Sequence, residues 1–468
     1  MSGPAVFKFG GTSLGDAERI GDVAALIADV EAPPVVVVSA PAGLTETLVE
    51  IAQEGPRPGG ISDSAGDGTT LAREALERMP RDLARRVGGE ALQDEVARLV
   101  LDRLEAFDRH TPGDESARDD LLAVGEDVAV RLLKAALDRR GIRAAVVDAR
   151  VVVRTDDGFG SAAPDIDAIH ATTRAHLLPL VSSGTVPVVQ GFVGGTADGR
   201  TTTLGRGGSD LSATLIGAAL SSSAVHIWTD VDGILTGDPR WVDRPRSLDV
   251  VGFEEAVELA WFGARVLHAG AAKHAVAHRL PVRIRSTFAP ERPGTLILAE
   301  RWGGPDIAAV ACKRSVALIQ VRSRPSAIEY GFLAEVFGTL AELRTPVDLV
   351  ATSHTSTAFT IDENADLRAL GDALDRVAEV EVRRGLSTVT VVGRGLLREP
   401  GFAARVFQTV AFTSVHLISQ ATDSSLSFLV DDAEAERLVR RLHLVLIEGR
   451  GARQQPQGDD RDSVEGAV

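Results

Sequence analysis

Cysteine is almost absent from this sequence: Cys312 is the single one in 468 residues. One thiol cannot form an intramolecular disulfide, so we expect a reducing compartment and place the protein in the cytoplasm. No apolar run approaches the length of a membrane span, and the N-terminus lacks the charged-then-apolar pattern of a secretion signal. A disulfide-stabilised secreted protein and a membrane partner are therefore not expected.

Positive charge is also in the minority. The sequence has 50 Lys and Arg residues against 66 Asp and Glu residues, a formal net charge of −16. A nucleic-acid surface needs a basic stripe, and the sequence contains none, so we expect no nucleic-acid partner. The hydrophobic content of 44% is ordinary for a globular protein, and the length allows two or three domains.

The first 300 residues alternate short apolar runs with longer helical patterns. The runs are rich in β-branched residues and bounded by turn residues; they cover 5–10, 34–40, 143–149, 186–192, 225–231 and 281–286. This alternation predicts an α/β domain with a mainly parallel sheet and helices on both faces. Residues 54–72, rich in Gly, Pro and Ser, predict a loop, and residues 73–139 predict an almost wholly helical region.

After about residue 310 a pattern occurs twice. Segments 331–353 and 401–423 each begin with Gly-Phe and carry Val-Phe five and six residues after the Gly. Each continues as a helical stretch and a strand, with a further strand predicted at 356–362 and at 426–431. Such a repeat predicts a duplicated βαββ module. The predicted domains are 1–300, 315–390, and 391–448 completed by 301–314, followed by a disordered polar tail at 449–468.

The most informative stretch is TTTLGRGGSDLSATLIGAAL, residues 201–220. It places Arg206 in a glycine-rich loop directly before an apolar helical pattern. Glycine lets a backbone approach a ligand closely, and the free N–H groups of a helix N-terminus favour an anion. An arginine there can hold a carboxylate or phosphate through two parallel hydrogen bonds. Taken alone, the loop is equally compatible with a glycine-rich surface turn.

Other polar segments stand at the ends of predicted strands or just after them. They are KFGGTS at 8–13, SAPAGLT at 39–45, GED at 125–127 and TDVDGILTGDPR at 229–240. In open α/β sheets, ligands bind at the edge formed by the carboxyl ends of the strands. A lysine at the end of a core strand, such as Lys8, is costly unless it faces an anion. With Arg206 it suggests a nucleoside triphosphate, although no GxxxxGK[ST] motif is present, which excludes a P-loop fold. Taken alone, Glu126 would be a solvated helix-cap charge.

Read in order, KFGGTS, QGFVGG (190–195), TTTLGRGGSD, TDVDGI with DPR, and FGARVLHA (262–269) resemble the motifs of the aspartate kinases. The C-terminal repeat resembles that family's pair of ACT domains, and GFLAEVFG (331–338) resembles the lysine-sensitive bacterial type. The resemblance implies an amino acid kinase fold followed by two ACT domains. It also implies transfer of the γ-phosphoryl group of ATP, with Mg²⁺, to the β-carboxylate of L-aspartate. The product, 4-phospho-L-aspartate, would begin aspartate-family amino acid biosynthesis or a dedicated branch from it.

The resemblance also implies roles for single residues. Lys8 would neutralise the transferring phosphoryl group, and Asp210 would orient Lys8 or the metal-bound phosphates. Arg206 would clamp the α-carboxylate and Glu126 would receive the α-ammonium group. The other substrate-binding residues would be Ser39, Thr45, Phe192, Gly207, Gly208 and Ser209. The nucleotide would be bound by Lys8 with Phe9, Gly10, Gly11, Thr229, Asp230, Leu235, Arg240, Arg265 and Val266. No protein metal ligand is assigned, since Mg²⁺ is held mainly by phosphates.

Regulation and assembly follow from the same resemblance. An amino-acid effector would bind the first ACT domain, and the ACT pair would mediate a homodimer or a dimer of dimers. The effector residues implied are Phe332, Leu333, Val347, Asp348, Thr352 and Ser353. Position 354 holds histidine where relatives commonly have an acid, which removes a charge-assisted bond of about 1.5 to 3 kcal/mol. We therefore expect weak or no lysine inhibition. Arg265 and Ala269 replace the usual Lys and Pro, which predicts altered nucleotide affinity.

Two alternatives remain open from the sequence. The first is a related carboxylate kinase that uses glutamate, N-acetylglutamate or an aspartate analogue. Glu126 with Arg206 favours a free α-amino acid over an acetylated one, and the ACT pair favours aspartate. The second is an inactive amino-acid sensor that retains the ACT pair, against which the presence of Lys8, Arg206 and Asp210 argues.

Overall fold

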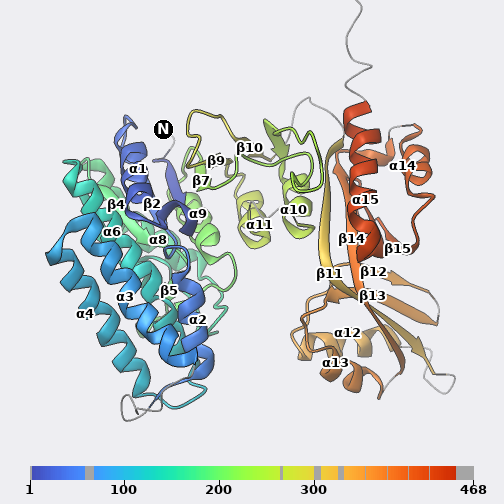
Figure 1. Cartoon of the computed structure of the whole chain (residues 1–468), viewed down its shortest axis with the longest axis horizontal. Helices are drawn as coiled ribbons and strands as arrows, with labels where there is room; N and C mark the ends of the chain where they lie inside the picture. Colours follow the sequence, from blue (N-terminus) through green and yellow to red (C-terminus); the bar gives the residue numbers. More distant parts are fainter. Residues whose placement is uncertain are drawn as a thin grey trace, which may run out of the picture. The chain divides into compact units, whose positions relative to one another are not determined.

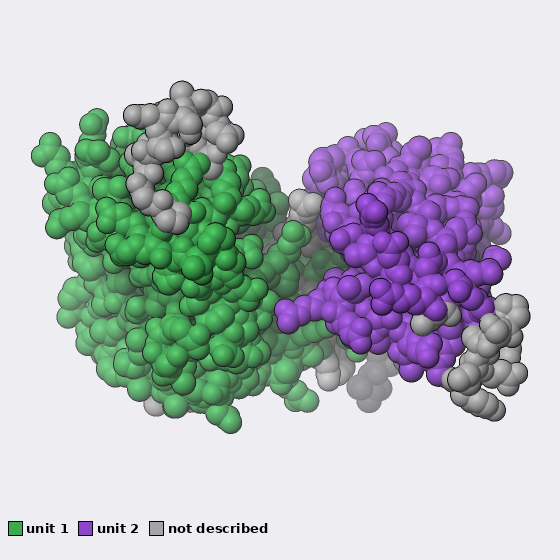
Figure 2. All heavy atoms as spheres, turned by 90° about the horizontal axis from the view of Figure 1, so that it is seen from below, with its two compact units in different colours: residues 1–234, 247–261, 265–302 green, residues 235–246, 262–264, 303–468 purple. Residues whose placement is uncertain are grey.

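The chain consists of two compact units (Figures 1 and 2). The first contains residues 1–234, 247–261 and 265–302, and the second contains residues 235–246, 262–264 and 303–468. The computed structural model describes residues 3–57, 68–263, 267–299, 307–324, 331–353, 355–376, 378–398, 400–420 and 422–449. The tail predicted at 449–468 lies outside these ranges except for its first residue. None of the helices in the described part is long and apolar enough to cross a bilayer.

An eight-stranded sheet organises the first unit, in the order β3-β4-β2-β1-β7-β9-β10-β8. Its strands are β1 (Val6–Phe9), β2 (Val35–Val38), β3 (Ala144–Val147), β4 (Val186–Gln190), β7 (Val225–Thr229), β8 (Val250–Gly252), β9 (Val282–Ser286) and β10 (Thr295–Leu298). From β3 to β9 all neighbours in the sheet are parallel, whereas β10 is antiparallel to β9. The six predicted strands are confirmed, and their carboxyl ends meet at one edge.

Helices cover both faces of this sheet. They are α1 (Ala17–Ala28), α2 (Leu44–Glu54), α3 (Gly68–Gly88), α4 (Glu90–Asp108), α5 (Glu115–Leu122), α6 (Val124–Arg139), α7 (Ala149–Val152), α8 (Ile166–Ser182), α9 (Gly208–Ala219), α10 (Phe253–Trp261) and α11 (Ala269–Ala277), with the 3₁₀ turn η1 (Gly11–Leu14). Helices α1 and α6 pack on one face, with α3 and α4 outside them, and α8 and α9 pack on the other (Figure 1). The fully buried Phe9, Val36 and Val188 belong to the core of the first face.

The predicted helical region 73–139 is confirmed, but the predicted loop 54–72 extends too far. Helix α3 already begins at Gly68. Ala72 and Leu76, one turn apart, are 5% and 0% exposed and join the core, so burial extends the helix into the Gly-rich segment. A hairpin of β5 (Val193–Gly195) and β6 (Thr201–Thr203) was not predicted, because strands of three residues carry too little alternation.

The second unit is built on a six-stranded antiparallel sheet in the order β12-β13-β11-β14-β16-β15. Its elements are β11 (Ile307–Ser323), α12 (Phe332–Glu342), β12 (Val350–Thr352), β13 (Ser356–Asp362), α13 (Leu367–Leu374), β14 (Ala378–Gly393), η2 (Leu396–Arg398), α14 (Phe402–Val410), β15 (Val415–Ser419), β16 (Ser425–Asp431), α15 (Asp432–His443) and the π turn η3 (Leu444–Glu448). The strands predicted at 356–362 and 426–431 are confirmed as β13 and β16. The predicted fold class, an α/β domain followed by α+β modules, is confirmed.

The two βαββ modules of this sheet share their two longest strands. Residues 307–313 of β11 pair with residues 388–393 of β14, next to β16. Residues 316–322 of β11 pair instead with β13 as well as with the first half of β14. One core gathers around Phe402 and Phe428, and a separate one around Val336 and Phe359. The modules therefore form one continuous sheet with two hydrophobic cores.

Candidate active site

An enclosed ion pair marks the carboxyl edge of the first unit's sheet. Lys8 is on β1, between the parallel strands β2 and β7, and its Nζ is 2.7 Å from Oδ1 of Asp210 on α9. The two side chains are only 12% and 14% exposed. The backbone N–H of His268 donates to the other oxygen of Asp210 at 3.3 Å. The structure thus brings together two of the predicted catalytic residues.

The loop after β1 packs closely against the loop after β2. A Cβ on Gly11 would lie 2.6 Å from the carbonyl oxygen of Ala40, so only glycine fits there. A Cβ on Gly10 would lie 3.8 Å from Nζ of Lys8, which places the ammonium group over this loop. Ser39, between the two loops, donates its backbone N–H to the Phe9 carbonyl at 3.1 Å. The predicted residues at these two strand ends therefore form one surface, while Thr45 is exposed in the first turn of α2.

Helix α9 begins at the glycine-rich loop. Gly207 is its N-cap with φ +71°, and a Cβ there would lie 2.1 Å from Cγ of His268, so both conformation and space require glycine. Arg206 is exposed, and no described residue forms an ion pair with it. An unpaired guanidinium beside the N–H groups of a helix N-terminus is a site for a carboxylate or phosphate.

Phe192 holds a strained conformation after β4. Its φ is +65°, a value that costs energy for any residue with a side chain. Its N–H donates to Oγ of Ser212 at 3.1 Å, and its carbonyl accepts from Leu204 at 2.9 Å. A Cβ on Gly208 would lie 2.9 Å from its ring. These contacts fix Phe192 against the first turn of α9, next to the glycine-rich loop.

Glu126 is buried rather than solvated as its isolated position would suggest. It lies in the first turn of α6 and is 5% exposed. Its Oε1 accepts a hydrogen bond from the N–H of Ala40 at 3.0 Å. Burial raises the pKa of Glu126 to about 8, although the Ala40 hydrogen bond and the charge of Lys8 act in the opposite direction. Such a carboxyl group gains most from a cationic ligand, which would replace the lost hydration.

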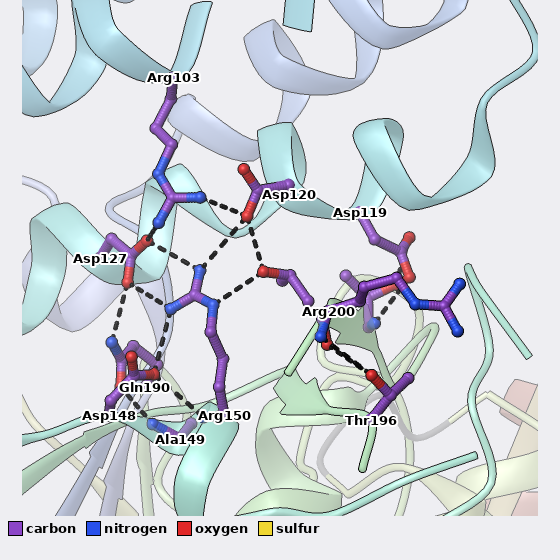
Figure 3. Close-up of polar contacts among 12 residues, drawn as sticks. Arg103, Asp119, Asp120, Asp127, Asp148, Ala149, Arg150, Gln190, Thr196 and Arg200 are labelled. Atoms are coloured by element: carbon purple, nitrogen blue, oxygen red, sulfur yellow. Dashed lines mark hydrogen bonds and ion pairs between the residues drawn. The ribbon is translucent and has the colours of Figure 1, made fainter. Parts of the chain in front are cut away.

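A buried charge network behind Glu126 was not predicted (Figure 3). Arg150 lies 3.0 Å from Asp127, which is 4% exposed. Gln190, at the end of β4, donates to Asp127 at 2.8 Å and accepts from the N–H of Ala149 at 2.9 Å. Burial tends to raise the pKa of Asp127, but the charge and hydrogen bonds of Arg150 outweigh it and hold the pKa below its usual value. The network fixes α6, and with it Glu126, to the sheet edge.

Breaking this network should destabilise the first unit. Substitution of Arg150 by methionine leaves the Asp127 carboxylate buried without its main partner, at a cost of about 3 to 5 kcal/mol. Urea unfolding of the full chain measures the loss. Lys134→Met is the control, since its ion pair with Asp138 is 39% and 47% exposed and should cost less than about 1 kcal/mol. Equal losses in the two variants would contradict the role given to Arg150.

Two adjacent acids on α5 hold strand β6, which leads into the glycine-rich loop that contains Arg206 (Figure 3). Asp119, fully buried, accepts from the N–H groups of Thr203 at 2.8 Å and Gly160 at 2.9 Å. Asp120 accepts from Oγ1 of Thr201 at 2.6 Å and pairs with Arg103. Thr203 is three residues before Arg206, so α5 anchors the start of that loop. In the sequence, this anchoring role is indicated only by the adjacent acids Asp119 and Asp120 near the end of a predicted helix.

The predicted nucleotide residues are only partly gathered. Thr229 ends β7, and its hydroxyl donates to the exposed Asp230 at 3.1 Å. Arg240, 79% exposed, pairs with Asp238. Leu235 and Arg240 belong to the second unit (Figure 2), and Arg265 and Val266 lie outside the described residues. The hydroxyl of Ser13, in η1 and in the segment KFGGTS, lies 2.7 Å from that of Thr287, directly after β9. Thr287 was not predicted.

The predicted effector residues lie in the second unit. Phe332 and Leu333 begin α12, and Val347 and Asp348 precede β12. Thr352 ends β12 and Ser353 follows it. Phe332 and Val347 pack against the same core, whereas Thr352 and Ser353 are exposed. Asp348 is 4% exposed. His354 lies outside the described residues.

Comparison with known proteins covers nearly the whole chain. Residues 4–286 match the amino acid kinase family, and residues 389–446 match an ACT domain. The lysine-sensitive aspartokinase 3 of Escherichia coli K12 is 37% identical over 96% of this chain and 100% of its own length. The crystal structure of E. coli aspartokinase III with aspartate and ADP (R-state) has a TM-score of 0.84, with 35% identity over 95% of this chain and 99% of that one. Its complex with lysine and aspartate (T-state) has a TM-score of 0.78 at the same identity and coverage.

Proposed function

Because the chain belongs to the amino acid kinase family and is an aspartate kinase, we propose that it phosphorylates the β-carboxylate of L-aspartate with ATP at the sheet edge that carries Lys8. The observation that carries this proposal is the meeting, at one edge, of the enclosed pair Lys8–Asp210, the exposed Arg206, which has no ion-pair partner among the described residues, and the buried Glu126. These groups match the charges of an amino acid and of a transferring phosphoryl group.

The substrate's two α-substituents are matched by two protein charges. We assign its α-carboxylate to Arg206, beside the N-terminus of α9, and its α-ammonium to Glu126. Ser39, Thr45, Phe192, Gly207, Gly208 and Ser209 would complete the pocket. A buried carboxyl group is a poor partner for an acetylated amine, because an amide carries no charge to compensate burial. The assignment therefore favours free aspartate over N-acetylated acids.

We assign Lys8 to the phosphoryl group that is being transferred. Phosphoryl transfer depends on positioning and charge neutralisation, which a fixed ammonium provides. Asp210 would orient that ammonium. Gly10 was also expected to supply a backbone N–H to the phosphates, but its N–H already donates to the Trp228 carbonyl at 3.1 Å, which leaves Gly11 as the donor proposed in this loop. The attacking β-carboxylate is ionised at neutral pH, so no general base is needed.

The nucleotide would lie beside Phe9, Thr229 and Asp230, with Leu235, Arg240, Arg265 and Val266 assigned to it from the sequence. The described residues contain no group of three metal-ligating side chains that could enclose an ion. Mg²⁺ would be held mainly through the phosphates, where it would neutralise their charge.

Acyl phosphate trapping tests the reaction. With ATP and hydroxylamine, L-aspartate should give the hydroxamate, whereas L-glutamate and N-acetyl-L-glutamate should give far less. Preference for either of the latter would identify a related carboxylate kinase instead. Absence of turnover with every acid in a folded protein would identify an amino-acid sensor and overturn the proposal.

The KM for aspartate should fall as the pH rises toward 8. Glu126, with its pKa raised to about 8, is protonated in the free enzyme at lower pH and must lose that proton to pair with the substrate ammonium. Apparent affinity should therefore decrease up to about tenfold for each pH unit below 8. Initial rates between about pH 6 and pH 8 measure this. The Glu126→Gln variant, with a high KM, should show a flatter profile; the same slope in both would exclude Glu126 as the source.

We also propose an amino-acid effector site in the first ACT module, formed by Phe332, Leu333, Val347, Asp348, Thr352 and Ser353, and a homodimer or a dimer of dimers. Light scattering after size-exclusion chromatography tests the assembly. A cytoplasmic location agrees with the single cysteine of the chain.

A further inference from the structure

The acid of the proposed effector site already has a partner within the chain. Nζ of Lys313 on β11 lies 2.6 Å from Oδ2 of Asp348, both as an ion pair and as a hydrogen bond. The Asp348 side chain is 4% exposed and that of Lys313 is 23% exposed. Removing one member of an ion pair that is largely shielded from water costs folding free energy, because the other member would remain buried and charged.

The Lys313 side chain carries the same primary ammonium group as free lysine. An amino-acid effector that used its ammonium group to bind Asp348 would have to displace Lys313 and restore its hydration. We propose that Lys313 is an internal competitor that occupies the carboxylate of Asp348 and keeps cationic amino acids from binding. This rests on the proposed effector site and explains its expected insensitivity to lysine.

Lys313 also lies where the two modules join. It pairs in register with Thr388 on β14, and the register shifts between Lys313 and Val316. Within that irregular stretch Ser315 has φ +57°, and its carbonyl accepts from the N–H of Glu363 at 2.8 Å. On one side β11 belongs to the second module, and on the other side to the first. Displacement of Lys313 would therefore act on the strand that both modules share.

The test is lysine binding to the full chain by isothermal titration calorimetry, with the hydroxamate assay in parallel. Lys313→Met frees Asp348 and should bind L-lysine at least tenfold more tightly than the unmodified protein, whereas Lys313→Arg should stay weak. Adding Asp348→Asn to Lys313→Met should remove the gain. Arg314→Met is the matched control, since this neighbouring side chain is 56% exposed and 4.0 Å from Asp432.

Two results would overturn the proposal: tight lysine binding by the unmodified protein, or a folded Lys313→Met variant that binds no better. Thermal unfolding with and without lysine keeps the test valid if Lys313→Met is unstable, because lysine should raise its midpoint more than that of the unmodified protein. Lys313→Gln, which keeps a neutral donor, gives a second variant with the same expected direction. The kinase proposal is judged separately, since loss of hydroxamate formation without lysine would affect every variant alike.

Discussion

Replacing Lys8 with alanine should lower kcat by about three orders of magnitude or more, because it removes the positive charge that we assign to the transferring phosphoryl group. The KM for aspartate should change less, since Arg206 and Glu126 remain. The fold should persist: Asp210 loses the ammonium group but keeps the hydrogen bond from His268. Steady-state rates with saturating ATP and aspartate, together with circular dichroism, measure both outcomes.

Lys134→Ala is the control for this variant. It removes a lysine from the exposed side of α6. The Nζ of Lys134 lies 2.6 Å from Asp138, a distance close to that of the Lys8–Asp210 pair. Its kcat should match that of the unmodified enzyme. If Lys8→Ala turned over at a near-normal rate while folded, Lys8 would have no part in the transfer, and the pair with Asp210 would be structural.

Arg206→Ala should raise the KM for aspartate by about one to two orders of magnitude, which corresponds to the binding free energy of one charge-assisted hydrogen bond. The KM for ATP should stay within a few fold. The α-carboxylate keeps its charge throughout the reaction, so its binding is nearly equal in ground and transition states and kcat should change little. Arg206→Lys should fall between, because an ammonium keeps the charge and loses the two-pronged geometry.

Arg200→Ala is the matched control for Arg206. It lies in the turn between β5 and β6, is 46% exposed and pairs with Asp198, so its loss should leave both KM values unchanged. If the KM for ATP rose steeply in Arg206→Ala while that for aspartate stayed constant, the glycine-rich loop would bind the nucleotide and the substrate assignments would have to be exchanged.

Local pattern was sufficient to predict that several residues of the proposed site lie at one sheet edge. Lys8 and Thr229 follow from strand ends, because parallel strands bring their carboxyl ends to one edge whatever the exact packing. Arg206 follows instead from the glycine-rich loop that precedes α9. The burial of Glu126 was not accessible, since it depends on Ala40, which is 86 residues away in the chain. The same holds for Asp119 and Asp127, whose partners come from β4, β6 and α7. Acids on a helix look solvated until the elements that cover them are known.

In the fold, too, some features follow from local pattern and others depend on residues far apart in the chain. Six apolar runs predicted six parallel strands, since each is long enough to show its composition. The three-residue strands β5, β6 and β8 have no such signal. The repeat at 331 and 401 predicted two modules, and residues 301–314 were expected to complete the second. The register in which β11 and β14 pair, and the point at which each strand passes from one module to the other, depend on long-range pairing.

The sharing of β11 between the two modules has a consequence for synthesis of the chain. The β11 residues 307–313 leave the ribosome before the whole first module, yet their partners on β14 are made after it. Until then Ile307, Ala308, Ala309, Val310 and Ala311 lack their β14 partners, and an apolar strand edge of this kind is prone to pair with other chains. A fragment that ends after the first module would keep this hazard permanently. An aggregation-resistant regulatory fragment should therefore begin before Ile307 and continue beyond Asp431, so that both halves of the sheet can close.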